Sequence, residues 1–253
     1  MTEKPADGAP WIRRFHPAPD AAVRLVCLPH AGGSASFFFP FSRELAPETE
    51  VLCVQYPGRQ DRRAEPNIPD LHELADRIAE ALTPWDARPT ALFGHSMGAT
   101  LAFEVARRMQ AAGRPPRELF VSGRRAPHRN FDDGLHLLPD EELVAGLKEL
   151  DGTGTEVFGD PDLLDLIVPA IRSDYRAAET YRCAPGPRLS CPVQAFTGFS
   201  DPRVPVGELH HWSAHTDGAF DLQVFSGGHF YLLDNMPAIL RTVTRRLACI
   251  AAC

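Results

Sequence analysis

The stretch TALFGHSMGAT, residues 90–100, places a serine between two glycines where two patterns meet. The apolar run before the serine is typical of a buried strand, and residues 99–112 have the spacing of a helix. The sequence therefore predicts a strand, a sharp turn and a helix, with Ser96 at the turn. A side chain at Gly94 or Gly98 would clash where the strand and the helix come this close. We interpret Ser96 as a nucleophile held out of a sheet.

Apolar segments alternate with helical patterns on both sides of this turn, which favours a mostly parallel sheet covered by helices on both faces. A chain of 253 residues with 44% hydrophobic residues is large enough for one such core. We predict an α/β fold in a single domain, residues 1–253. Further strands are expected at residues 23–28, 51–56, 119–122, 193–197 and 222–225, and further helices at residues 37–45, 70–82, 205–215 and 237–250.

Charge and composition limit the kinds of partner. The chain has 26 basic and 33 acidic side chains, a formal charge of −7, which argues against nucleic acid except at a local basic patch. The polar N-terminus has no apolar signal segment, and no stretch approaches 18 uninterrupted apolar residues. We expect no membrane association and a cytoplasmic protein. The six cysteines form no C-x-x-C pair, so we expect reduced thiols, with Cys27 and Cys53 as small core residues.

Residues 126–182 separate two predicted strands by more than an ordinary connection, so this segment should have its own structure. Helical patterns occur at residues 140–150 and 163–181. Because the segment follows a strand at the carboxyl edge of the sheet, where open α/β folds bind ligands, we predict a mobile lid. Its expected apolar underside includes some of Leu143, Leu147, Leu163, Leu164 and Ile167, and its candidate hinges are Gly152, Gly154 and Gly159.

A serine nucleophile needs a base, and the base needs an acid that orients it. In α/β-hydrolases these residues occur in the order serine, acid, histidine. His229 lies in the glycine-rich loop after the last predicted strand, and Asp201 follows the strand before it. We therefore predict a triad of Ser96, His229 and Asp201. Asp217 and Asp221 are the nearest alternatives for the acid, although both lie in or beyond the intervening helix.

The oxyanion formed by serine attack needs two backbone donors. The N–H of Met97 is at the positive end of the helix that follows the serine. The second donor should come from the loop PHAGG, residues 29–33, after the first long strand. We assign it to Ala31, with Gly32 as the alternative.

The other histidines have no obvious catalytic role. His95 is expected to pack or hydrogen-bond beside the turn. His211 and His215 are four residues apart but lack the glutamate of an H-E-x-x-H zinc motif. We expect no metal and no cofactor.

Five segments together resemble the type II thioesterases that accompany modular polyketide and nonribosomal peptide synthases. They are LPHAGGSASFF, VQYPGR, LFGHSMGATLAFEVAR, SGRRAP and GGHFYL, in this order and spacing. The similarity extends over residues 11–247 and includes the oxyanion loop as well as the serine turn. Residues 249–253 match no motif of the family.

The resemblance implies an α/β-hydrolase fold with a helical lid, and a Ser-His-Asp triad that maps onto Ser96, His229 and Asp201. It also implies hydrolysis of acyl groups from the phosphopantetheine arm of acyl or peptidyl carrier proteins. We therefore predict an editing thioesterase. The alternatives are a medium-chain acyl thioesterase that ends fatty-acid synthesis, a general carboxylesterase or lipase, and a non-catalytic binding protein, although the intact triad argues against the last.

Two further expectations concern selectivity. A pocket lined mainly by aliphatic side chains would distinguish acyl groups by only about 1 to 3 kcal/mol per methylene. Selectivity should then come from the carrier protein, whose acidic surface would meet arginines near the entrance. The candidates are Arg59, Arg62, Arg63, Arg124 and Arg125, which are equally consistent with an ordinary solvated face.

Overall fold

A seven-stranded sheet organises the protein, whose structure is a computed structural model describing residues 10–85, 87–129, 133–150 and 161–252. The strands from β2 to β7 pair in parallel, and only β1 is antiparallel to its neighbour. The strand order is β1 (Ile12–Arg13), β3 (Thr49–Val54), β2 (Val23–Leu28), β4 (Thr90–His95), β5 (Glu118–Ser122), β6 (Val193–Gly198) and β7 (Phe220–Phe225).

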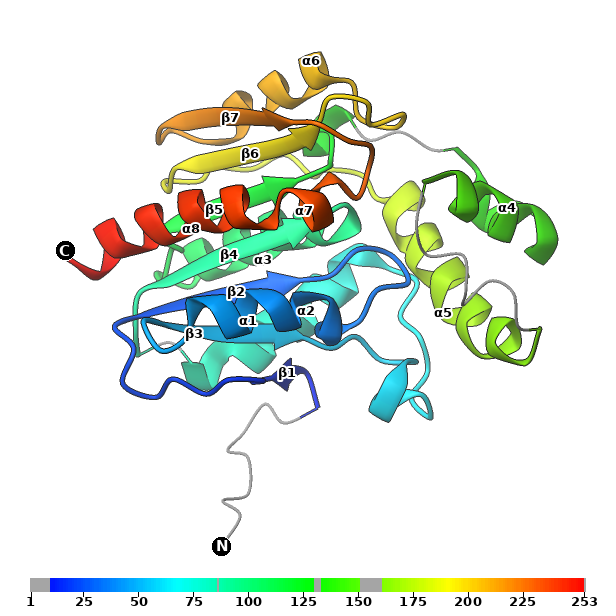
Figure 1. The fold of residues 1–253 in the computed structure, drawn as a ribbon, viewed down its shortest axis with the longest axis horizontal. Coiled ribbons are helices and arrows are strands. Elements are labelled where there is room, and N and C mark those ends of the chain that lie inside the picture. Colours follow the sequence, from blue (N-terminus) through cyan, green and yellow to red (C-terminus); the bar gives the residue numbers. More distant parts are fainter. Residues whose placement is uncertain (1–9, 86, 130–132, 151–160, 253) are drawn as a thin grey trace, which may run out of the picture.

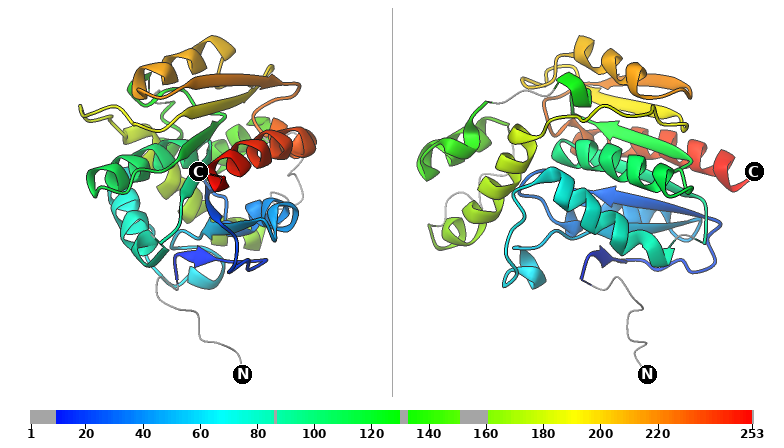
Figure 2. Two further views of the ribbon diagram at one scale, coloured as in Figure 1. Left: turned by 90° about the vertical axis from the view of Figure 1, so that its left-hand side faces the viewer. Right: turned by 180° about the vertical axis from the view of Figure 1, so that it is seen from behind.

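Helices cover both faces of this sheet (Figures 1 and 2). One core contains residues of α2 (Leu71–Leu82) and α3 (Met97–Ala111), and the opposite core contains residues of α1 (Phe39–Leu45) and α8 (Met236–Ala251). The strands from β2 to β6 are buried along their whole length, as expected for strands covered on both sides. The predicted α/β-hydrolase architecture is confirmed.

The remaining helices lie near the carboxyl ends of the strands or after β6. Between β5 and β6 the chain forms α4 (Asp140–Leu150) and α5 (Pro161–Thr180), beside the edge towards which the strand arrows point in Figure 1. After β6 comes α6 (Val206–Leu209), and α7 (Tyr231–Asp234) follows β7. Short 3₁₀ turns occur at Ala35–Phe38, Gln60–Arg62, Thr83–Trp85, Pro127–Arg129, Leu135–Leu137 and His210–His215.

Three details differ from the sequence-based expectations. The two-residue strand β1 was not predicted, because a strand this short has no periodicity to detect. The helix expected at residues 205–215 is the short α6 followed by a 3₁₀ turn. The short helix α7 was also not predicted, since its residues follow the glycine-rich loop without a helical pattern.

Strand register brings the two loops needed for chemistry together. Leu28, the last residue of β2, is paired with Gly94 in β4, so the loop after β2 lies beside the turn at Ser96. On the other side of β4, His95 is paired with Ser122 at the end of β5. The candidate site is therefore built at the carboxyl edge of the central strands.

Candidate active site

Ser96 occupies a tight turn between β4 and α3. Its backbone has φ 54° and ψ −120°, a conformation that L-residues rarely adopt. A Cβ on Gly94 would lie 2.0 Å from the carbonyl oxygen of Gly98, and a Cβ on Gly98 would lie 2.0 Å from that of Leu28. Both glycines are therefore required by close backbone approach, as the sequence predicted.

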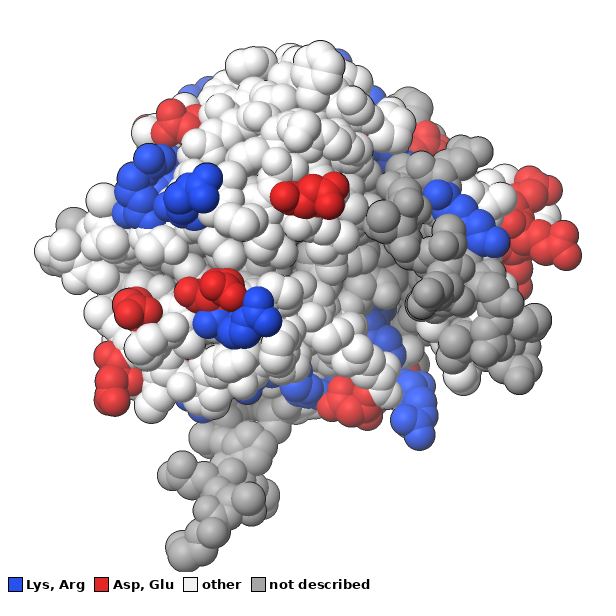
Figure 3. Space-filling view, in the orientation of Figure 1, with Lys and Arg blue, Asp and Glu red and all other residues white. Residues whose placement is uncertain are grey.

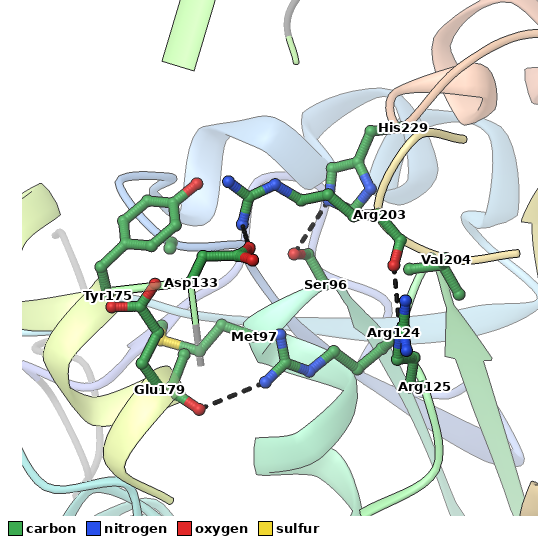
Figure 4. A pocket seen from close by; sticks show the side chains of 13 residues that line it. Ser96, Met97, Arg124, Arg125, Asp133, Tyr175, Glu179, Arg203, Val204 and His229 are labelled. Carbon is green, nitrogen blue, oxygen red and sulfur yellow. Dashed lines mark hydrogen bonds and ion pairs between the residues drawn. The ribbon is translucent and has the colours of Figure 1, made fainter. Parts of the chain in front are cut away.

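The structure brings Ser96, His229 and Asp201 together from three different loops. His229 Nε2 is 3.0 Å from Ser96 Oγ, and His229 Nδ1 is 2.8 Å from Asp201 Oδ2 (Figure 4 shows the first contact). Both His229 and Asp201 are buried. Because the carboxylate accepts at Nδ1, the Nε2 that faces Ser96 can take the serine proton.

Backbone N–H groups fix the carboxylate of Asp201. Its Oδ1 accepts hydrogen bonds from the N–H groups of Arg203 (2.9 Å) and Val204 (3.2 Å), which leaves Oδ2 for His229. The alternative acids point to other partners. Asp217 pairs with Arg188 at 3.4 Å, and Asp221 pairs with Arg246 at 3.0 Å.

The two predicted oxyanion donors lie next to the serine. Met97 begins α3, so its N–H has no acceptor within the helix. Ala31 and Met97 both line a cavity that Ser96 and His229 also line. The N–H of Gly32 instead donates to Asp174 Oδ2 at 2.8 Å. The Gly32 N–H is thus engaged elsewhere, and Ala31 stays the predicted donor from this loop.

Two further histidines lie near His229: His95 is fully buried and His30 is half-buried. Burial, together with the nearby His229, lowers the pKa of His30 to about 3 and also lowers the pKa of His95. His95 Nδ1 is 3.0 Å from Ser122 Oγ, which is itself 2.6 Å from the hydroxyl of Tyr231. Packing or hydrogen bonding beside the turn was predicted for His95, but no sequence pattern pointed to Ser122 as its partner or to Tyr231 beyond it. Both histidines are neutral near pH 7.

The cavity beside Ser96 is small, and its lining mixes charged and apolar side chains. Its volume is about 50 Å³, enough for a few water molecules. Figure 4 shows that charged and polar side chains surround it, so the expectation of a mainly aliphatic lining is wrong. These side chains are Arg124, Arg125, Asp133, Tyr175, Glu179 and Arg203.

The charges of this lining are largely held in place. Arg203 pairs with Asp133 at 3.0 Å, and Arg125 Nε donates to the backbone oxygen of Arg203. Burial lowers the pKa of Arg124 to about 10, so this guanidinium remains charged at neutral pH. Arg124 and Arg125 come directly after β5 in the segment SGRRAP, and their position at the strand end could have indicated a polar lining.

The apolar face of the segment between β5 and β6 does not roof this cavity, contrary to expectation. Leu143 and Leu147 belong to a separate apolar cluster that also contains Val168 and Ile171 of α5. Leu164 and Ile167 pack against the same cluster. None of these side chains lines the cavity; the residues of α5 that do are Tyr175, Ala178 and Glu179. The reason is that α4 and α5 bury their apolar faces against each other, so these side chains are not available to the cavity. The side chain of Leu163 and the predicted hinges Gly152, Gly154 and Gly159 lie outside the described residues.

Two of the five arginines proposed for carrier binding are not on the surface. Arg59 and Arg62 are buried and paired with Asp174 and Glu65. Arg124 and Arg125 are half-buried and line the cavity, and Arg63 is exposed. The expectation is therefore wrong for Arg59 and Arg62 and stays a prediction for the other three. On the face in Figure 3, basic and acidic side chains of the described residues occur in small mixed groups rather than as one basic patch.

The remaining candidates have structural roles. Cys27 and Cys53 are fully buried in strands, and burial raises the pKa of each thiol, as expected for core residues. His215 Nε2 lies 2.6 Å from His128 Nδ1, and no group of three or more side chains suited to a metal occurs among the described residues. No helix in the described part of the chain is long and apolar enough to cross a membrane.

The fold and this geometry define an α/β-hydrolase with a serine, a histidine and an aspartate in hydrogen-bonded sequence. A family model for the thioesterase domain matches residues 23–247. The chain belongs to the thioesterase family.

Individual relatives with similar sequences are also named as thioesterases. Thioesterase PikA5 of Streptomyces venezuelae is 51% identical over 251 residues, which cover 98% of this chain and 89% of that protein. The probable cadicidin biosynthesis thioesterase of Streptomyces griseus is also 51% identical, over 94% of this chain but 66% of its own length. The solved structure of the type II thioesterase BorB from the borrelidin biosynthetic cluster has a TM-score of 0.90 and 54% identity, covering 96% of this chain and 99% of BorB. The resemblance drawn from the sequence motifs is confirmed.

Proposed function

We propose that this chain is an editing thioesterase, which removes stalled or wrong short acyl groups from the phosphopantetheine arms of acyl or peptidyl carrier proteins in the cytoplasm. The observation that carries the proposal is the chain of contacts from Ser96 Oγ to His229 and Asp201, beside a cavity, in a member of the thioesterase family. The domain organisation in this proposal is a single domain over residues 1–253, with residues 126–182 as the lid insertion.

The proposed reaction has two halves. Ser96 Oγ attacks the thioester carbonyl while His229 Nε2 takes its proton, and the N–H groups of Met97 and Ala31 stabilise the oxyanion. The intermediate collapses with cleavage of the C–S bond, and His229 returns the proton to the departing sulfur. Water, deprotonated by His229, then attacks the acyl-serine ester and releases the acid with Ser96 restored. The carrier's phosphopantetheine is part of the substrate, and the proposed steps need no cofactor.

Leaving-group chemistry favours thioesters over other acyl compounds. A thiol has a pKa near 8.5, far below that of an alcohol or an amine, so it leaves with little assistance. A site that provides a nucleophile and an oxyanion hole without a deep binding channel can therefore act on thioesters.

The small cavity, with charged groups in its lining, favours short acyl groups. Burying a long alkyl chain against the guanidinium and carboxylate groups that line it would desolvate these groups without compensation. This observation disfavours the medium-chain thioesterase, because the cavity beside Ser96, about 50 Å³ in volume, has little room for a long chain.

The test compares one acyl group in three forms. We would measure kcat/KM for a propionyl group on a carrier protein, on coenzyme A and as a simple ester, and repeat it with acetyl and hexanoyl groups. We expect the carrier-bound thioester to be preferred, and less than about a thousandfold difference among acyl groups. A thousandfold preference for hexanoyl would favour the chain-terminating thioesterase, and an equal rate on the simple ester would favour a general esterase. The variant Ser96→Ala serves as the inactive control.

A further inference from the structure

Asp174 links the helix α5 to the loop that carries the second oxyanion donor. Its buried carboxylate accepts the N–H of Gly32 at 2.8 Å through Oδ2. The same carboxylate accepts both ends of the Arg59 guanidinium, at 2.6 Å on Oδ2 and 2.8 Å on Oδ1. Neither charge takes part in the mechanism proposed above, and buried ion pairs are often no more stable than apolar substitutes. Their presence here calls for another reason.

Arg59 also holds the other side of the loop. Its Nη1 donates to the backbone oxygen of Gly33 at 3.0 Å, so the ion pair binds one N–H and one carbonyl group of two successive residues. A bidentate guanidinium–carboxylate pair is planar and directional, which makes it suited to fixing geometry as well as balancing charge.

The loop between these contacts is a tight turn. The N–H of Gly33 donates to the oxygen of His30 at 3.0 Å, and Gly32 has φ 75°, as in the third position of a type II turn. Ala31 is the second residue of this turn, and the His30 carbonyl that accepts the turn hydrogen bond shares its peptide plane with the Ala31 N–H. The direction of the Ala31 N–H is therefore set by the turn, whose Gly32 N–H Asp174 holds.

The helix α5 is also in direct contact with the turn. A Cβ on Gly32 would lie 2.8 Å from Cγ1 of Ile171, one turn before Asp174 on α5. The position of α5 and the conformation of the turn are therefore coupled through both packing and hydrogen bonds.

We propose that Asp174, held by Arg59, is a positioning residue that aligns the Ala31 N–H for the oxyanion, so that the reactivity of Ser96 depends on α5 being seated on this loop. The inference rests on the proposed function for its substrate. It does not need that function for its test, because the same hole stabilises the charge that develops when Ser96 is phosphonylated.

The test separates positioning from folding. In the variant Asp174→Leu/Arg59→Met both charges are replaced by apolar side chains of similar size, so no unpaired charge is left buried. We expect its Tm to stay near that of the unchanged protein. The rate at which a fluorophosphonate labels Ser96, and kcat on a propionyl thioester, should each fall about 100-fold, with KM changed less than threefold.

A graded series and a matched control complete the experiment. Asp174→Asn keeps one acceptor oxygen for Gly32 and should lose less labelling rate than Asp174→Ala. Arg172→Gln is the control, because Arg172 is also on α5 and pairs with Asp140 at 2.5 Å, away from the oxyanion loop; it should label at the unchanged rate.

If the double variant is stable and labels Ser96 at the unchanged rate, the positioning role is wrong, whatever the substrate. A drop in Arg172→Gln as large as that in Asp174→Ala would also overturn it, since any loosening of α5 would then suffice. If the unchanged protein labels rapidly but hydrolyses no thioester, the proposed function fails and this inference stands on the labelling data.

Discussion

Ser96 is held in an uncommon backbone conformation by backbone hydrogen bonds. Its N–H donates to the backbone oxygen of Ser122 at 2.8 Å, and its backbone oxygen accepts the N–H of Ala99 at 2.9 Å. Conformations of this kind cost about 1 to 3 kcal/mol and persist where the surroundings enforce them. The strain keeps Oγ at the edge of the sheet, within reach of His229.

Substitution of Ser96 or His229 by alanine should abolish turnover while the fold survives. We expect kcat to fall about 10⁴- to 10⁶-fold in each single variant, and no further in the double variant, because the residues act as a unit. Asp201→Asn should cost about 10⁴-fold through the wrong histidine tautomer. Asp217→Asn is the matched control and should keep full activity, since Asp217 is exposed and pairs with Arg188. Substantial hydrolysis by purified, folded Ser96→Ala would show that another group is the nucleophile.

The glycines of the turn give a second residue-scale prediction. Gly98→Ala should lower the free energy of unfolding by about 3 kcal/mol or more, because the new methyl group would lie 2.0 Å from the oxygen of Leu28. Gly207→Ala is the control, since nothing lies within 4 Å of the added atom. Chemical denaturation of both variants measures the difference, and equal stabilities would contradict the account of the turn.

At the scale of elements, the segment between β5 and β6 has two parts with different anchorage. Most of α4 and the middle of α5 form their own apolar cluster. The end of α5 instead joins the main core through Ala177 and Ala178, and the Tyr181 hydroxyl donates to Glu104 Oε1 at 2.8 Å. Because the end of α5 is packed into the main core, we do not expect the whole segment between β5 and β6 to move as one lid.

Amide hydrogen exchange should therefore divide this segment. We expect amides of α4 to exchange faster than those of β4, because α4 buries its apolar face mainly against α5 and the turn at Leu135–Leu137. Amides near Asp174 and Ala178 should exchange as slowly as those of the sheet. Exchange in α4 as slow as in β4 would argue against any lid motion, and fast exchange near Ala178 would contradict the anchorage.

For the whole molecule, the lowered pKa values of His30 and His95 predict a loss of stability in acid. The folded pKa of His30 is about 3, whereas a histidine in an unfolded chain has a pKa near 6.5, so only the unfolded state binds this proton between these values. His95, whose pKa is also lowered, acts in the same direction. The free energy of unfolding should fall as the pH falls below about 6.5, by about 1.4 kcal/mol per pH unit for each histidine, and not change from this cause above it.

The measurement is urea unfolding between pH 7.5 and 4.5. In the variant His30→Phe, the new ring can pack against Phe37 and Phe230, which contact His30. The slope of the unfolding free energy against pH should become smaller by about 1.4 kcal/mol per pH unit, the effect of one proton. His210→Gln, at an exposed position, is the control and should leave the slope unchanged. A slope identical in His30→Phe and in the unchanged protein would mean that His30 is protonated in the folded state.

The sequence by itself determined the alternation of strands and helices, the turn at Ser96 and the order in which serine, aspartate and histidine follow the strand ends. These features are local: apolar runs, glycines and loop positions record them within a few residues, and parallel strands bring their carboxyl ends to one edge. Only the tertiary structure decided what meets across that edge. It showed a cavity lined in part by charged side chains instead of a mainly aliphatic one, and a segment whose leucines are buried against each other. It also showed an ion pair between residues 59 and 174 that holds the loop after β2. Contacts between side chains so far apart in the chain depend on how whole elements pack, and no periodicity in either segment records them.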